Sequence, residues 1–200
     1  MSSPLDGAPE NLTELLDAVQ PQGDETYVSV QDMLKRIGGR SFPAVILVPS
    51  VLMVSPISGI PTAPTLSALV IMTCAFQGLF GRSHLWLPGF LMRRKISARR
   101  LQKGIDWLRR PAGWMDRHSK GRLRLLTAGP MRPFAFLFSI LIALSWPLLE
   151  LVPFVTSFGA GAVAMIMFGL MTRDGAYLVA GYVQGTAIYI TLLSIWSGLF

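Results

Sequence analysis

The stretch Gln77-Gly-Leu-Phe-Gly-Arg-Ser-His-Leu-Trp-Leu-Pro88 marks the border between two chemically different parts of the chain. Before it, residues 41–81 contain no charged side chain, whereas residues 82–132 contain fourteen of the 18 Arg and Lys residues. An arginine between glycines and Trp-Leu-Pro is typical of a place where an apolar helix ends at water. We interpret this stretch as a membrane boundary, with a related boundary at residues 169–175, Gly-Leu-Met-Thr-Arg-Asp-Gly.

The composition of the 200 residues favours a membrane protein. Hydrophobic residues make up 52% of the chain and charged residues 14%, with a mean hydropathy of +0.49. A soluble domain has about 25% charged residues. The apolar residues also fall in long unbroken blocks, which indicates membrane spans. The net charge of +7 gathers in one loop between such blocks, which is the positive-inside pattern, so we expect no nucleic-acid partner.

The sequence predicts an all-α, polytopic helical membrane protein with about five membrane segments. Residues 1–40 form a cytoplasmic N-terminal head with two short helices, and residues 41–200 form the membrane domain. In the head, the first helix covers about residues 10–19, Ser29 with Asp32 begins the second, and Gly38-Gly39 ends it. The predicted membrane segments are residues 42–56, 63–80, 133–149, 154–172 and 176–199.

The first two membrane segments allow two interpretations. They flank the turn Pro56-Ile-Ser-Gly-Ile-Pro61, where glycine and two prolines favour a chain reversal. At 1.5 Å per residue the two arms are roughly 22–27 Å long, slightly less than the ~30 Å hydrocarbon core. They either span the membrane or form a re-entrant hairpin, and both alternatives return the chain to the side it left.

The basic segment 82–132 is predicted to lie on the cytoplasmic face. A helix is expected from Ser97 to Arg110, ended by Pro111, with Leu101, Ile105 and Leu108 on one side. A basic amphipathic helix with Trp107 and Trp114 nearby suits the headgroup layer of anionic lipids. The alternative is a solvated segment that only sets the membrane topology.

A shift of 91 residues aligns the two halves of the membrane domain and indicates a parallel repeat of two hairpins. Each half would close on Gly-Leu-x-x-Arg, and the sites of such proteins often lie between repeats. The matched pairs are Pro56 with Pro147, Thr65 with Thr156, Gly78 with Gly169, Leu79 with Leu170, Arg82 with Arg173, and Leu87 with Leu178.

Several short motifs together resemble the exopolysaccharide synthesis protein ExoD family of bacterial membrane proteins. These are Gly39-Arg-Ser-Phe42, the Pro56–Pro61 turn, Gln77–Arg82 with Trp86-Leu-Pro88, and Arg173-Asp-Gly175. The resemblance implies a bacterial inner-membrane protein linked to exopolysaccharide production, and it designates no catalytic residues. Gly81, Trp86, Pro88 and Gly175 are the residues that carry the motifs.

The candidate ligand-binding residues lie at the predicted membrane edges. Arg82 is either a helix-end anchor or a cation that binds a lipid-linked phosphate. Glu150, at an outer turn, is either solvated or a carboxylate that couples transport to a proton or another cation. The other candidate contacts are Arg173 and Asp174, as an ionic site or a helix cap, and Gln77 and Gln184, as ligand contacts or as partners in helix–helix hydrogen bonds.

The predicted function is a contribution to exopolysaccharide synthesis or export, by a transporter-like protein or one that handles a lipid-linked phosphate. The alternative is a non-catalytic scaffold subunit of a polysaccharide synthase complex. No nucleophile–base–acid arrangement, metal-ligand spacing or phosphate-binding Gly-rich loop occurs, so we expect no enzyme activity, metal or cofactor. The expected partners are membrane lipids, the polysaccharide-synthesis machinery and a second copy of the chain.

Overall fold

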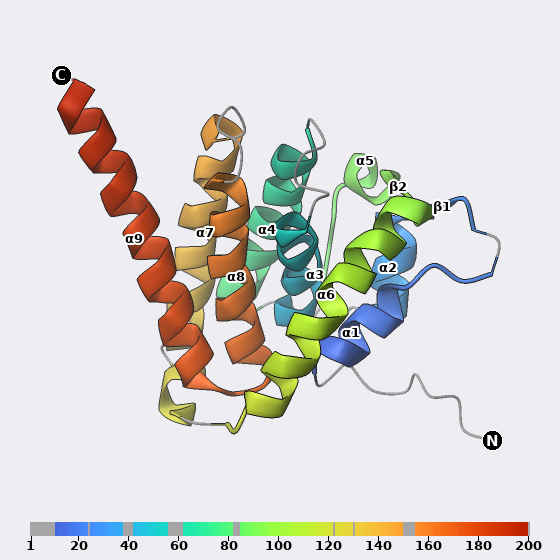
Figure 1. Cartoon of the computed structure of the whole chain (residues 1–200), viewed down its shortest axis with the longest axis horizontal. Coiled ribbons are helices and arrows are strands. Elements are labelled where there is room, and N and C mark those ends of the chain that lie inside the picture. Colours follow the sequence, from blue (N-terminus) through green and yellow to red (C-terminus); the bar gives the residue numbers. More distant parts are fainter. Residues whose placement is uncertain are drawn as a thin grey trace.

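The computed structural model describes residues 11–23, 25–37, 42–55, 62–81, 85–121, 123–129, 131–149 and 155–199. The Gly38-Gly39 helix stop, the Pro56–Pro61 turn, Arg82 and Glu150 therefore lie outside the described residues. A bundle of apolar helices forms one side of the protein, and a smaller polar unit lies beside it (Figure 1).

The bundle contains the helices that the apolar blocks predict. Pro, Gly and polar residues end these helices close to the expected positions. Among the described residues, no helix combines the length and the apolarity that a membrane crossing requires. The helices are α3 (Phe42–Val54), α4 (Ala63–Leu79), α7 (Met131–Leu149), α8 (Val155–Met171) and α9 (Gly175–Leu199).

The two hairpins pack in a reciprocal manner. Helix α3 packs against α4 and α8, whereas α7 packs against α8 and α4. Helices α3 and α7 run in one direction along the bundle, and α4 and α8 return in the other (Figure 1). If α3 is exchanged with α7 and α4 with α8, the contact of α3 with α4 becomes that of α7 with α8, and the contact of α3 with α8 becomes that of α7 with α4. This is the contact pattern that a repeat of two hairpins would have. Helix α9 continues from α8 and lies against it at the edge of the bundle.

Close approach of the helices depends on glycine. A Cβ atom on Gly78 of α4 would lie 2.8 Å from the ring of Phe136, and one on Gly181 of α9 would lie 2.7 Å from the carbonyl oxygen of Ala162. Gly185 is similarly close to Ile142, at 2.8 Å. The small-xxx-small spacing from Gly181 to Gly185 thus marks a helix contact, as its pattern predicts.

The polar unit combines the N-terminal head with the first part of the basic segment. Strand β1 (Tyr27–Ser29) pairs antiparallel with β2 (Lys95–Ser97), in register Val28 with Ile96. The helices of this unit are α1 (Leu12–Val19), α2 (Val30–Ile37), α5 (Gly89–Met92) and α6 (Ala98–His118), and a 3-10 turn η2 (Arg124–Thr127) precedes α7. Helix α1 packs on α6, and α2 packs on α5.

The helix starts in the head follow their sequence signals. Ser29 and Asp32 form a reciprocal capping box, because the Asp32 amide donates to the Ser29 hydroxyl oxygen at 3.1 Å and the Ser29 amide donates to the Asp32 carboxylate at 3.3 Å. This pairing satisfies two amide groups that the first turn of α2 would otherwise leave without a partner.

The end predicted for the basic helix at Pro111 is wrong, because α6 continues to His118. Pro111 is exposed, so the carbonyl group that loses its intrahelical bond lies on the solvent side of the helix. Beyond it, Ala112 is buried, and the Asp116 carboxylate accepts the amide hydrogens of Leu12 and Thr13 at 2.9 Å each. These contacts stabilise the extra turns.

Candidate functional site

A cavity of about 320 Å³ lies where the polar unit meets the first hairpin. Its walls come from α2, α3, α4, α5 and β2, so it forms only when the head, the hairpin and the basic segment pack together. The apolar lining consists of Val30, Met33, Leu34, Ile37, Val45, Val48, Pro49, Leu52, Met53, Ala63, Leu66, Val70, Leu91 and Ile96.

Three basic residues, Arg94, Lys95 and Arg100, also line this cavity, and all three are exposed to solvent. None of the described residues in the lining carries a carboxylate. Among the residues that the structure describes, none of the three cations forms an ion pair, whereas Arg36 pairs with Glu25 and Arg109 with Asp17. The cavity therefore combines an apolar interior with a positively charged mouth.

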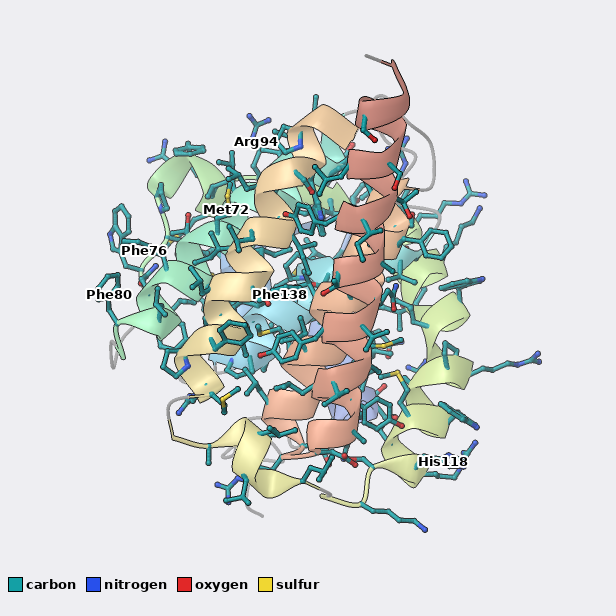
Figure 2. All side chains as sticks on the ribbon, turned by 90° about the vertical axis from the view of Figure 1, so that its left-hand side faces the viewer. Met72, Phe76, Phe80, Arg94, His118 and Phe138 are labelled. Atoms are coloured by element: carbon teal, nitrogen blue, oxygen red, sulfur yellow. The ribbon has the colours of Figure 1, made fainter. Side chains whose placement is uncertain are left out.

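The β1–β2 pairing fixes the position of the basic mouth. The amide of Val30 donates to the carbonyl oxygen of Arg94 at 3.0 Å, and Ser29 pairs with Lys95 in the ladder. Arg100 lies in the first turn of α6, whose N-cap residue Ser97 makes no side-chain capping hydrogen bond. The mouth thus also faces the positive end of a helix dipole. Figure 2 shows Arg94 at the upper end of the bundle in that view.

Sequence reasoning did not find this cavity. Its three cations belong to a segment interpreted as one basic loop, and its walls are distant in the chain. The strands that bring them together have three residues each and lack the longer alternation that predicts a strand. The available signal was the clustering of Arg93, Arg94 and Lys95 directly before the predicted helix.

Within the described part of the chain, Gln77 bonds to its own helix and to the segment after it, and not to a neighbouring helix. Its side-chain amide donates to the carbonyl oxygens of Thr73, at 2.9 Å, and Trp86, at 2.6 Å, while the Trp86 amide donates to its oxygen at 2.7 Å. It therefore fixes the chain that follows α4. In that chain, Trp86 is exposed, Leu87 is buried, and Pro88 is the N-cap residue of α5.

Asp174 is buried and acts as a helix cap. Its carboxylate accepts the amide hydrogen of Ala176 in the first turn of α9, at 3.0 Å, and that of Lys120, at 2.9 Å. Gly175 lies where a Cβ atom would be 2.5 Å from the carbonyl oxygen of Leu123. The contacts match the capping alternative and join α9 to the end of the basic segment.

The residues that follow α4 and α8 adopt a left-handed backbone at Gly81 (φ 63°) and at Arg173 (φ 55°). The amide of Gly81 donates to the carbonyl oxygen of Gly78, and the amide of Asp174 donates to that of Gly169, as in a Schellman helix end. The 91-residue shift pairs Gly81 with Thr172, whereas the left-handed residue after α8 is Arg173, one position later.

The candidate residues do not converge on one site. The side-chain amide of Gln184 donates to the carbonyl oxygen of Phe158 on α8, at 2.8 Å, which is the helix–helix hydrogen bond that its position predicts. Gln77, Asp174 and Gln184 bind three separate segments, and the Arg173 side chain is exposed. In the described part of the chain, no group of three His, Cys, Asp or Glu residues is placed to hold a metal ion.

The comparison with protein families assigns the chain. Residues 12–194 match the family described as Exopolysaccharide synthesis, ExoD, so the match covers most of the bundle and the polar unit. No curated protein and no solved structure matches the chain. The chain belongs to the ExoD family of exopolysaccharide synthesis proteins.

Proposed function

We propose that this protein is an integral protein of the bacterial inner membrane, with its N-terminus in the cytoplasm, that contributes to exopolysaccharide synthesis or export. The observation that carries the membrane assignment is the apolar outer surface of the bundle. The five bundle helices contain one charged residue, Arg132, in the first turn of α7. Lipid is the environment that suits such a surface.

The exposed apolar side chains of the bundle lie on α4, α7 and α9, and Phe158 adds one from α8. Leu144 is 60% exposed and Val183 is 65% exposed. Phe76 on α4 and Phe80, its C-cap residue, project outward (Figure 2). Soluble proteins rarely expose contiguous apolar surface on this scale. The other exposed apolar residues of this surface are Leu69, Phe134, Leu137, Leu141, Phe158, Val179, Ile190 and Leu193.

The opposite side of the molecule is basic. Helix α6 buries Leu101, Ile105 and Leu108 against the rest of the protein, and its exposed residues include Arg99, Lys103, Arg109, Arg110 and Arg117. The N-terminal part of α6 lies away from α9 (Figure 1), and its C-terminal end meets the start of α9, where the Tyr177 hydroxyl donates to the Met115 carbonyl oxygen at 3.1 Å. We assign this face to water and to anionic lipid headgroups, each cation near such headgroups contributing about 1 kcal/mol.

Substitutions to lysine test the membrane assignment. Leu141→Lys and Val183→Lys should each cost about 2–3 kcal/mol if these side chains face lipid, and about 0.5 kcal/mol or less if they face water. Tyr27→Lys in the polar unit is the control, because Tyr27 is also exposed, at 60%. The measurement is the fraction of folded protein that resists alkaline extraction from membranes. Recovery of the wild-type chain in the soluble fraction, with all three variants equally tolerated, would show that the assignment is wrong.

Within that function, the protein either handles a lipid-linked phosphate in a transporter-like manner or organises a polysaccharide synthase. If Arg82 and Arg173 bind phosphate, Arg82→Gln and Arg173→Gln should abolish polysaccharide production in a complemented deletion strain at normal protein level. Loss of protein level alone would reject that role.

The scaffold alternative is favoured by the exposed apolar residues Ile190 and Leu193 near the end of α9, which provide a surface for another membrane subunit. It predicts that the protein co-purifies with a synthase in mild detergent. Isolation as a lone protein that moves its substrate in vesicles would reject it.

A further inference from the structure

We propose that the cavity between α2, α3, α4 and the segment from α5 to α6 binds a single-chain lipid phosphate. The apolar chain of the ligand occupies the interior, and the phosphate binds Arg94, Lys95 and Arg100 at the mouth. This proposal deepens the proposed lipid-phosphate role and rests on it for the source of the ligand. Arg173 does not line this cavity.

The size of the cavity favours one apolar chain. Small-molecule sites measure about 300–1,000 Å³, and this cavity, at about 320 Å³, is at the small end of that range. Its interior is lined by Val45, Leu52 and Leu66, among other apolar side chains. A cavity of this size accommodates part of one isoprenoid or acyl chain and is too small for the paired chains of a phospholipid.

The charges at the mouth favour an anionic headgroup. Arg94, Lys95 and Arg100 lie within seven consecutive positions and are exposed, and none of the lining residues that the structure describes is acidic. The side chains of these residues offer several donors, which suits the three acceptor oxygens and the charge of a phosphate better than a single carboxylate. The uncapped start of α6 adds positive potential at the same place.

The structure also explains how a ligand would reach the site. The cations are at the solvent-exposed end of a cavity whose walls include two bundle helices, α3 and α4. An amphiphile can therefore keep its phosphate in water or among headgroups while its chain enters apolar surroundings. This arrangement requires no charged group of the protein to be buried.

The experiment uses the purified full-length chain in a neutral detergent and a fluorescent farnesyl phosphate as the probe. The double variant Arg94→Gln/Arg100→Gln should weaken binding at least tenfold. The matched control is Arg93→Gln/Arg99→Gln, which removes the same charge from the two adjacent exposed residues that do not line the cavity, and it should change the Kd less than twofold. Equal loss in both variants would show nonspecific attraction and overturn the proposal.

A second pair of variants tests the cavity itself. Ser67→Trp fills it from α4 and should also weaken binding at least tenfold, whereas Leu69→Trp, on the exposed side of the same helix, should not. Competition distinguishes the ligand class: farnesyl phosphate should displace the probe, and farnesol, a fatty acid and phosphatidylglycerol should do so at least tenfold less well. Comparable displacement by any of these three would reject a single-chain phosphate.

Failure of this proposal can be told apart from failure of the membrane function. Alkaline extraction of the same variants reports on membrane insertion, which the Arg94 and Arg100 substitutions should leave unchanged. A chain that inserts normally but does not bind the probe rejects the cavity proposal alone. A chain that binds the probe but is recovered in the soluble fraction rejects the membrane function alone.

Discussion

The side chain of Gln77 holds the backbone of Trp86 by two hydrogen bonds, donating to its carbonyl oxygen at 2.6 Å and accepting from its amide at 2.7 Å. The backbone amide and carbonyl groups of an extended segment usually pair with a neighbouring strand. Here the side chain of a glutamine on α4 provides both partners. Through this contact the chain leaves the first hairpin in a fixed direction, with the Leu87 side chain buried and the Trp86 side chain exposed.

Replacing Gln77 with leucine should therefore destabilise the protein by about 1–3 kcal/mol, because it leaves the Trp86 amide and carbonyl groups without partners. The measurement is chemical unfolding of the purified protein in detergent. Gln102→Leu is the control, since the Gln102 side chain bonds to the exposed Asp106 on its own helix, and its loss should change stability by about 0.5 kcal/mol or less. Equal effects of the two substitutions would contradict the structural role of Gln77.

Asp174→Ala should destabilise the protein by about 0.5–2 kcal/mol through loss of the α9 cap, and by a further contribution from the unpaired Lys120 amide. Hydrogen exchange at the first turn of α9 should increase in the same variant. Unchanged exchange there would show that the first turn of α9 does not depend on this carboxylate.

Arg173 supplies the matched comparison for that result. Its side chain is exposed, so Arg173→Gln should leave the free energy of unfolding unchanged. Arg173→Gly should be neutral or stabilising, because glycine adopts the positive φ of this position without steric cost. A large loss of stability in Arg173→Gln would reveal a paired guanidinium group and contradict this arrangement.

Asp116 should control the docking of α1 on α6. Asp116→Ala removes the acceptor for the amides of Leu12 and Thr13, so proteolysis within residues 11–19 should become faster and stability should fall by about 1–2 kcal/mol. Asp106→Ala, on the same helix, removes a contact with exposed Gln102 that does not involve α1, and it serves as the control. Similar proteolysis rates in the two variants would show that the Asp116 carboxylate does not hold the start of α1 on α6.

Acid should loosen the head before it affects the bundle. The Gln22 backbone amide and the Arg36 side chain lower the pKa of Glu25, and the Ser29 hydroxyl and amide lower the pKa of Asp32. A lowered folded-state pKa stabilises the fold above the unfolded-state value, and this contribution is lost as the pH falls through the folded-state pKa. Hydrogen exchange in residues 25–37 should therefore increase below about pH 4.

The double variant Glu25→Gln/Asp32→Asn provides the check on that pH dependence. It should exchange faster at neutral pH and respond less to acid than the wild-type chain. A variant with the wild-type pH profile would assign the acid response to other groups.

The sequence predicts the helices of the bundle well because long apolar blocks, prolines and glycines act locally. The capping box of Ser29 and Asp32 is equally local and is present in the structure. The end of α6 could not be predicted from Pro111, since the contacts that extend the helix, such as Asp116 with Thr13, involve residues far apart in the chain.

The candidate site shows the same limit more clearly. Gln77 and Gln184 have similar surroundings in sequence, yet one bonds to a loop backbone and the other to a neighbouring helix. Arg94, Lys95 and Arg100 become a cluster above an apolar cavity only through the pairing of β1 with β2. Tertiary contacts of this kind leave no periodic pattern in the sequence.

The pairing of β1 with β2 also sets an order of events during synthesis. Strand β1 has no partner until Lys95–Ser97 has left the ribosome, and the whole first hairpin is made in the interval. Because translation proceeds at about 5–20 residues per second, the N-terminal segment waits several seconds for that partner. The polar unit therefore closes only after the first hairpin has been synthesised, while α7, α8 and α9 are still to be made.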